Sequence, residues 1–144
     1  MKDEHTYGVI LADNDPGFMK VLKVLLNEIT GKRGGMSIRI AEVNSLAKAL
    51  AQMDKQTDMV VMHDVMIIND KDVFLKMLDQ KGKNCKLVIL LSHEGDGKVF
   101  ELMHIIEKAK GALPDLHLLR DNHSLGVMIL FLEDVLNQAG RTGN

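Results

Sequence analysis

The sequence predicts an α/β protein with a three-layer, doubly wound parallel sheet of five strands. Short apolar runs alternate along the chain with longer amphipathic stretches, giving five predicted strands and five predicted helices. Strands separated by helices pair in parallel through right-handed crossovers, which place helices on both faces of the sheet. For such a sheet we expect the flavodoxin-like strand order 2-1-3-4-5.

The first strand is predicted over residues 7–12, because YGVILA is a continuous apolar run typical of a buried strand. Asp15 and Pro16 then fit the cap and the first residue of a helix. Apolar residues at helical spacing continue this helix to about residue 30, where the segment GKRGG is expected to end it and form a loop.

The second strand is predicted over residues 36–43, where alternating apolar residues indicate a position near a sheet edge. A helix over residues 44–53 follows, with Asn44 or Ser45 as its cap. The third strand, residues 58–63, has the sequence DMVVMH and is apolar on both faces, as a central parallel strand should be.

The second half of the chain repeats the alternation. A helix over residues 69–82 precedes the fourth strand, KLVILLS, at residues 86–92. The segment HEGDG is expected to be a loop, and a fourth helix then covers residues 98–111. A weaker fifth strand is predicted at residues 115–119, and a long fifth helix over residues 122–140 closes the chain.

Length and composition indicate one globular domain, residues 1–144, with a core of about 7–138 and a small, polar segment 139–144 that is a tail or the start of a linker. The net charge of −2 gives no general attraction to nucleic acid or membranes, and 3% aromatic residues provide no stacking platform for single strands. No apolar stretch is long enough for a signal peptide or a transmembrane span, so we expect a cytoplasmic protein. The single cysteine, Cys85, is expected to be a half-buried structural thiol.

Polar residues follow four of the predicted strands. In a doubly wound sheet, sites lie beyond the carboxyl ends of the strands, at the switch point between the first and third strands. The residues expected at this edge are Asp13, Asn14, Asp15, His63, Asp64, Ser92, His93, Arg120 and Asp121. They predict a polar crevice of mixed charge.

Four segments, VILADNDPGFMKVLKVLL, TDMVVMHDVM, KLVILLSHEG and LHLLRD, together resemble the receiver domain of bacterial response regulators over about residues 7–138. The resemblance implies an acidic pair that holds Mg²⁺ after the first strand and a phosphoacceptor aspartate at the end of the third. It also implies a Thr or Ser after the fourth strand and a Lys followed by Pro after the fifth.

The chemical positions of that family match only in part. Asp13 matches the first acid, whereas Asn14 stands where the second, metal-contacting acid is expected. The pattern DxVLxDxxMP places His63 at the phosphoacceptor position. Ser92 fits the Thr/Ser position, and Arg120 replaces the Lys. Further departures are Ile67 and Asp121 at the two Pro positions, and His117 at the aromatic switch position of the fifth strand.

Asp64 is the alternative phosphoacceptor, because it is adjacent to His63 in the chain. A strand alternates its side chains, so Asp64 should point away from the crevice if His63 points into it, unless a bulge rotates it inward. Magnesium prefers carboxylate oxygens, and the loss of two of three carboxylates predicts weak or no Mg²⁺ binding. We therefore expect no cofactor, with Mg²⁺ required only if Asp64 is phosphorylated.

His63 itself has three interpretations. It could carry a phosphoryl group, form a metal site with Asp13 and His93, or hydrogen-bond Asp13 or Ser92 and close the crevice. The last is favoured, because neither the spacing nor the fold calls for the first two. Asp13 is thus at most a weak metal ligand.

Apolar residues on the predicted fourth and fifth helices exceed one buried stripe. Either both sides of these helices pack within the domain, or an apolar strip is exposed for a partner or a second copy. The candidate interface residues are Phe100, Met103, Met128, Phe131 and Leu132.

The sequence therefore favours a pseudo-receiver that is not phosphorylated and acts in signalling or assembly. We expect it to be an interaction module that forms a homodimer through these helices or serves an attached output domain, and not an enzyme. One alternative is an active receiver that uses Asp64. Another is a small flavodoxin-fold enzyme or nucleotide binder, against which the lack of a phosphate loop argues.

Overall fold

The computed structural model describes residues 5–32, 36–81, 84–92, 96–108 and 114–140. It contains a five-stranded, all-parallel sheet in the order β2-β1-β3-β4-β5, which confirms the predicted fold class and strand order. The strands are β1 (His5–Ala12), β2 (Met36–Val43), β3 (Thr57–His63), β4 (Lys86–Leu91) and β5 (Leu116–Arg120).

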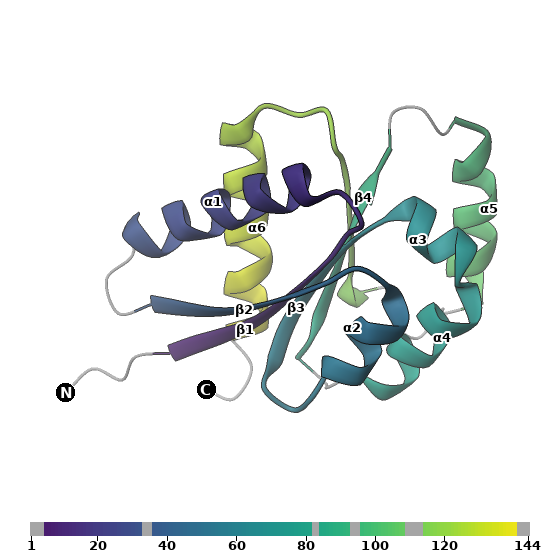
Figure 1. Cartoon of the computed structure of the whole chain (residues 1–144), viewed down its shortest axis with the longest axis horizontal. Helices are drawn as coiled ribbons and strands as arrows, with labels where there is room; N and C mark the ends of the chain where they lie inside the picture. The colour runs from purple at the N-terminus through teal and green to yellow at the C-terminus, as the bar shows by residue number, and fades with distance from the viewer. Residues whose placement is uncertain (1–4, 33–35, 82–83, 93–95, 109–113, 141–144) are drawn as a thin grey trace.

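Helices cover both faces of this sheet (Figure 1). The helices of the described residues are α1 (Pro16–Lys32), α2 (Leu46–Gln52), α3 (Asp64–Asn69), α4 (Lys71–Gln80), α5 (Asp96–Glu107) and α6 (Leu125–Gly140). Side chains of α1 and α6 pack with one face of the sheet in one apolar cluster, and side chains of α2 to α5 pack with the other face in a second cluster. The result is the three-layer arrangement that the sequence predicts.

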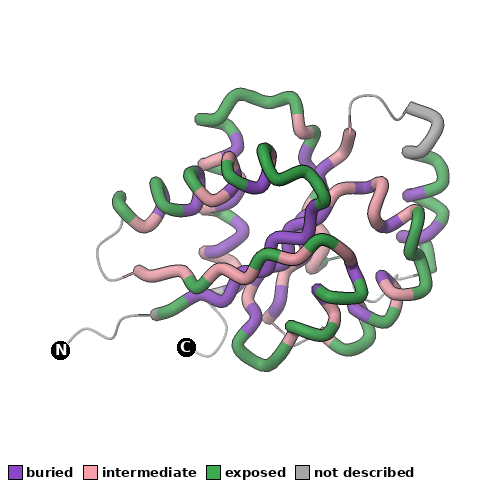
Figure 2. Tube along the Cα trace, in the orientation of Figure 1, coloured by how far each residue is buried: buried purple, intermediate pink, exposed green. Residues whose placement is uncertain are grey.

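The strands divide their side chains between the two clusters by simple alternation. In β3, Met59 and Val61 belong to the cluster of α1 and α6, whereas Val60 and Met62 belong to the opposite cluster. The central strands are therefore buried along most of their length, while the edge strand β2 is only partly buried (Figure 2). This alternation also decides which polar residues share a face where the strands end.

Short polar side chains begin two of the helices as predicted. Asp15 Oδ1 accepts hydrogen bonds from the backbone N–H groups of Gly17 at 2.9 Å and Phe18 at 3.3 Å, which caps α1. Ser45 accepts from the N–H of Lys48 at 3.2 Å and caps α2. These caps fix the directions in which α1 and α2 leave the sheet.

The sequence pattern predicts no element between the third strand and the helix expected from residue 69, but the structure has a short helix there. Helix α3 begins directly at Asp64, and the backbone of Asp70 (φ −135°, ψ 53°) separates it from α4. Asp64 lies in the first turn, where its negative charge favours helix formation, and the fully buried Ile67 anchors the turn in the core. The described chain thus has six helices where the sequence suggested five.

Two helix boundaries also differ from prediction. The first helix continues through Gly31 to Lys32, because a single glycine near a helix end is tolerated. Helix α5 already begins at Asp96, inside the segment predicted as a loop. Its predicted end at residue 111 lies outside the described residues. Within the described ranges, no helix has the length and apolar character needed to cross a membrane.

Candidate functional site at the carboxyl edge of the sheet

His63 occupies the centre of the carboxyl edge, between two carboxylates. Its Nδ1 lies 2.6 Å from Asp13 Oδ2, and its Nε2 lies 3.3 Å from Asp121 Oδ2. The ring of Phe18, in the first turn of α1, lies 4.8 Å away between centroids and is tilted by 54°. Only 16% of the His63 side chain is exposed, so this imidazole is largely enclosed by two anions and one aromatic ring.

Strand alternation explains why these three polar residues meet. Asp13 follows β1, His63 ends β3 and Asp121 follows β5, and each continues the set of side chains on the face of α1 and α6. The backbone N–H of Asp121 also donates to the carbonyl of Leu91 at 3.0 Å, which holds the residue against the end of β4. The sequence placed Asp121 at this edge but did not select it as a site residue, and the contact with Phe18 was not predicted.

The surroundings of His63 favour its protonated form. Burial alone would lower the pKa of the imidazole, but the hydrogen bond and charge of Asp13, joined by the charge of Asp121, raise that pKa above its ordinary value of 6.5. Asp13 is itself 4% exposed and accepts a further hydrogen bond from the N–H of Asp15 at 2.9 Å. His63 therefore forms the predicted hydrogen bond with Asp13, and this bond has the character of an ion pair.

Asp64 has a different set of contacts from its neighbour. Its Oδ1 accepts from the N–H of Val65 at 2.8 Å, and its Oδ2 accepts from the N–H of Ser92 at 3.1 Å. The residue is 1% exposed. Both carboxylate oxygens thus accept hydrogen bonds from the backbone, one from the first turn of α3 and one from the residue after β4. Asp64 therefore connects the start of α3 to the end of β4.

Other residues that the sequence placed at the site lie in different surroundings from His63. Asn14 is exposed on the wall of a pocket between α1 and α2, and Arg120 is exposed at the end of β5. Ser92 is partly buried and donates its backbone N–H to Asp64. His93 lies outside the described residues, so the site of Asp13, His63 and His93 is not described.

The residues of this edge do not fit Mg²⁺. The ion requires several oxygen ligands, usually including carboxylates, in near-octahedral geometry. Asp13 Oδ2 is engaged by His63, and both oxygens of Asp64 are engaged by backbone N–H groups. Within the part of the chain that the structure describes, no cluster of three or more His, Cys, Asp or Glu side chains could hold a metal ion.

His117, at the position of the aromatic switch residue, lies on β5 beside α6. Its ring is 6.4 Å from that of Phe131 in an edge-to-face arrangement. Its Nε2 is buried and has no hydrogen-bond partner within the described residues. Burial, followed by the charge of Lys86, lowers the pKa of this imidazole, so its environment favours the neutral ring.

The apolar strip predicted on the last two helices is present in modified form. Phe100 is 81% exposed and Met103 is 49% exposed on α5. On α6, Met128 and Leu132 are in the core, at 2% and 0% exposed, so they are not available to an interface, whereas Phe131 is only partly buried and stays a candidate. The exposed large apolar residues of β5 and α6 are Leu118, Leu125, Val127 and Leu130, at 42, 55, 43 and 64%.

Comparison with solved structures shows which proteins share this fold. A response regulator from Colwellia psychrerythraea aligns over 92% of this chain and 98% of its own, with 15% identity and a TM-score of 0.60. The non-phosphorylated HemR receiver domain from Leptospira biflexa aligns over 90% of this chain and 94% of its own, with 17% identity and a TM-score of 0.63. Full-length FixJ from B. japonicum aligns over 94% of this chain but 60% of its own, with 13% identity and a TM-score of 0.56.

The chain therefore has the fold of response-regulator receiver domains. No protein-family model matches it, and no curated protein matches it in sequence. At identities below a fifth, the likeness extends to the fold, and the chemistry has to be argued from the side chains of this chain.

Proposed function

We propose that this chain is a pseudo-receiver: a signalling or assembly module that keeps the receiver fold, is not phosphorylated, and works by binding protein partners. The observation that carries the proposal is the position of His63, which stands at the phosphoacceptor position and is held between Asp13 and Asp121. A receiver cycle depends on a carboxylate nucleophile and on a metal ion that offsets phosphoryl charge. Here an imidazole with a raised pKa stands at the position of the nucleophile, next to the one remaining carboxylate of the metal site.

Asp64 does not supply a ready substitute. Accepting a phosphoryl group would require one of its oxygens to leave the N–H of Val65 or Ser92, which would leave a partly buried donor without this partner. The oxygen would also have to act without a coordinated metal ion. These two costs support the proposal that Asp64 is not phosphorylated.

Partner binding is supported by exposed apolar residues on the last two helices. Phe100 and Met103 lie on α5, on one side of the sheet, and Leu130 lies on α6, on the other side, and they are 81, 49 and 64% exposed. We propose that these exposed residues contribute to a homodimer or to a contact with an attached domain. The alignment with 60% of full-length FixJ supports the second arrangement, because that protein extends well beyond the matched region.

The chemical part of the proposal is tested with the phosphoryl mimic beryllium trifluoride. Amide NMR spectra are recorded before and after adding beryllium trifluoride with 10 mM Mg²⁺, about the saturating range for a weak Mg²⁺ site. The proposal predicts no shift at Asp13, His63 or Asp64. Saturable shifts at these residues would show a working acceptor pocket.

The interaction part is tested by sedimentation velocity. Substitution of Phe100→Ser together with Leu130→Ser should convert a dimer into a monomer, since exposed apolar anchors contribute most to such contacts. Val24→Ser is the matched control, because Val24 is an apolar residue of comparable exposure, at 59%, on α1. A wild-type chain that stays monomeric at high micromolar concentration would exclude the homodimer and leave an attached or separate partner.

A further inference from the structure

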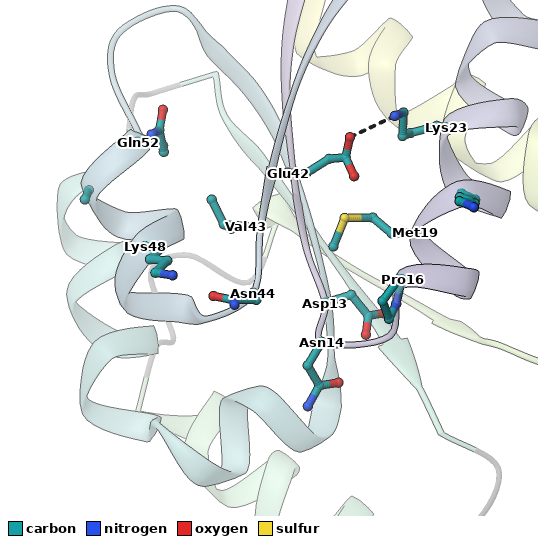
Figure 3. Close-up of a pocket in the computed structure, with 12 residues that line it drawn as sticks. Asp13, Asn14, Pro16, Met19, Lys23, Glu42, Val43, Asn44, Lys48 and Gln52 are labelled. Carbon is teal, nitrogen blue, oxygen red and sulfur yellow. Dashed lines mark ion pairs between the residues drawn. The ribbon is translucent and has the colours of Figure 1, made fainter.

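An opening near the carboxyl edge has no role in the function proposed above. It is an open pocket of about 740 Å³ between the start of α1, the end of β2 and the side of α2 (Figure 3). This volume lies within the range of small-molecule sites, roughly 300 to 1,000 Å³. It lies beyond the carboxyl ends of β1 and β2, at the edge of the sheet where α/β proteins bind ligands, but on the other side of β1 from the switch point.

The side chains that line the pocket carry one more positive charge than negative, with Lys20, Lys23 and Lys48 against Asp13 and Glu42. Glu42 is paired with Lys23 at 2.8 Å across the pocket (Figure 3), and Asp13 is paired with His63. Lys20 from α1 and Lys48 from α2 also line the pocket, and neither has an ion-pair partner among the described residues. Both lysines are exposed, so they can reach a ligand from opposite walls.

The remaining lining is suited to an organic group. Asn14, Asn44 and Gln52 present side-chain amides, which can both donate and accept hydrogen bonds. Apolar atoms come from Pro16, Met19, Val43 and Ala51. Small-molecule sites commonly combine an apolar wall with a few polar groups that fix orientation.

We propose that this pocket binds a phosphomonoester of mononucleotide size, with its phosphate held between Lys20 and Lys48. The apolar wall of Met19 and Val43 would contact the organic part of the ligand, and Asn44 and Gln52 would hydrogen-bond its edge. Lysine is an effective phosphate ligand as a point charge, so a glycine-rich phosphate loop is not needed. The cap donors of α1 are already used by Asp15, which leaves the phosphate to the two lysines.

One departure from the receiver pattern is consistent with this ligand. Asn14 stands on the pocket wall where the receiver family has a metal-contacting acid. A carboxylate at this position would repel an anionic ligand, whereas a neutral amide can donate to it. The substitution that weakens a metal site therefore makes the adjoining pocket more favourable for a phosphate. The inference does not depend on the interaction role proposed above.

The test is isothermal titration calorimetry at low ionic strength with the four common ribonucleoside monophosphates, run beside adenosine and inorganic phosphate. At least one nucleotide should bind with a dissociation constant below about 1 mM, and at least tenfold more tightly than adenosine or inorganic phosphate. The variant Lys20→Gln with Lys48→Gln should weaken that binding about tenfold or more, because it removes two charge-assisted contacts. Amide NMR shifts should map to Asn14, Asn44 and Lys48.

The matched control is Lys76→Gln, an exposed lysine on α4 that lines neither this pocket nor the strand ends, and it should leave binding unchanged. Circular dichroism confirms that each variant is folded. Failure of all four nucleotides to bind, equal binding of inorganic phosphate, or unchanged affinity in the double lysine variant would overturn the proposal.

Discussion

The imidazole of His63 and the carboxylate of Asp13 form a largely enclosed hydrogen bond, with 2.6 Å between Nδ1 and Oδ2, which is an ion pair whenever the imidazole is protonated. Each residue is enclosed: the side chains of His63 and Asp13 are 16% and 5% exposed. An interaction at this depth is only weakly screened by salt.

The pKa of His63 should depend on both carboxylates, and more on Asp13 than on Asp121. An NMR titration of the imidazole should give a value above 6.5 in the wild type. Asp13→Asn removes the closest carboxylate and should lower that pKa by more than Asp121→Asn does. A wild-type value at or below 6.5, or a larger effect of Asp121→Asn, would contradict the assigned contacts.

The same pair should make stability depend on pH in a defined direction. Because folding raises the pKa of His63, its contribution is complete below the unfolded value of 6.5 and is lost as pH rises through the folded value. Urea denaturation gives the free energy of unfolding of wild type and of His63→Gln. The wild type should exceed the variant in this free energy by about 1–2 kcal/mol more at pH 6 than at pH 9.

Comparison with the variant cancels the contribution of His117, whose pKa is shifted in the opposite direction. Below about pH 5 the carboxylates themselves begin to take up protons, so the comparison is restricted to higher pH. An advantage that is the same at both pH values would mean that folding does not shift the pKa of His63.

Replacing two of the glycines by alanine should change the free energy of unfolding in opposite directions. A Cβ added at Gly8 would lie 2.4 Å from the backbone oxygen of Gln56, so Gly8→Ala should lower the free energy of unfolding by about 1–3 kcal/mol. At Gly31, in α1, nothing lies within 4 Å of an added Cβ, and Gly31→Ala should raise the free energy of unfolding by about 0.5 kcal/mol. Chemical denaturation measures both, and a neutral Gly8→Ala would place β1 and the residue before β3 further apart than described.

Cys85 should be unreactive in the folded protein. The residue is 1% exposed, and burial raises the pKa of its thiol to about 12, so little thiolate exists at neutral pH. A thiol reagent should label it at a rate limited by unfolding and react fully in guanidinium chloride. Fast labelling under native conditions would indicate an open route to this side chain.

Much of the fold was predictable because it follows from apolar periodicity. The doubly buried run of β3 and the alternation of β2 indicated a central and an edge strand, and the caps Asp15 and Ser45 marked where helices begin. Helix α3 was missed because its apolar residues, Val65 to Ile68, form too short a run to show helical period. Its start depends on the tertiary contact between Asp64 and Ser92.

The candidate site was predictable only in outline. Strand ends indicated which residues gather at one edge, and alternation separated His63 from Asp64. The choice of Asp121 over Arg120 as the partner of His63 depends on the turn after β5, where the N–H of Asp121 bonds Leu91. The burial of Met128 and Leu132 likewise depends on how α6 is rotated against the sheet, which apolar composition alone does not fix.

The most direct test of the account is intact mass spectrometry after incubation with acetyl phosphate and Mg²⁺, on wild type and on Asp64→Asn. The account predicts that neither protein gains the mass of a phosphoryl group, because His63 is paired with Asp13 and Asp64 is bound to backbone donors. A stoichiometric gain in the wild type that is absent from Asp64→Asn would show an acceptor shifted by one residue, and it would contradict the pseudo-receiver assignment.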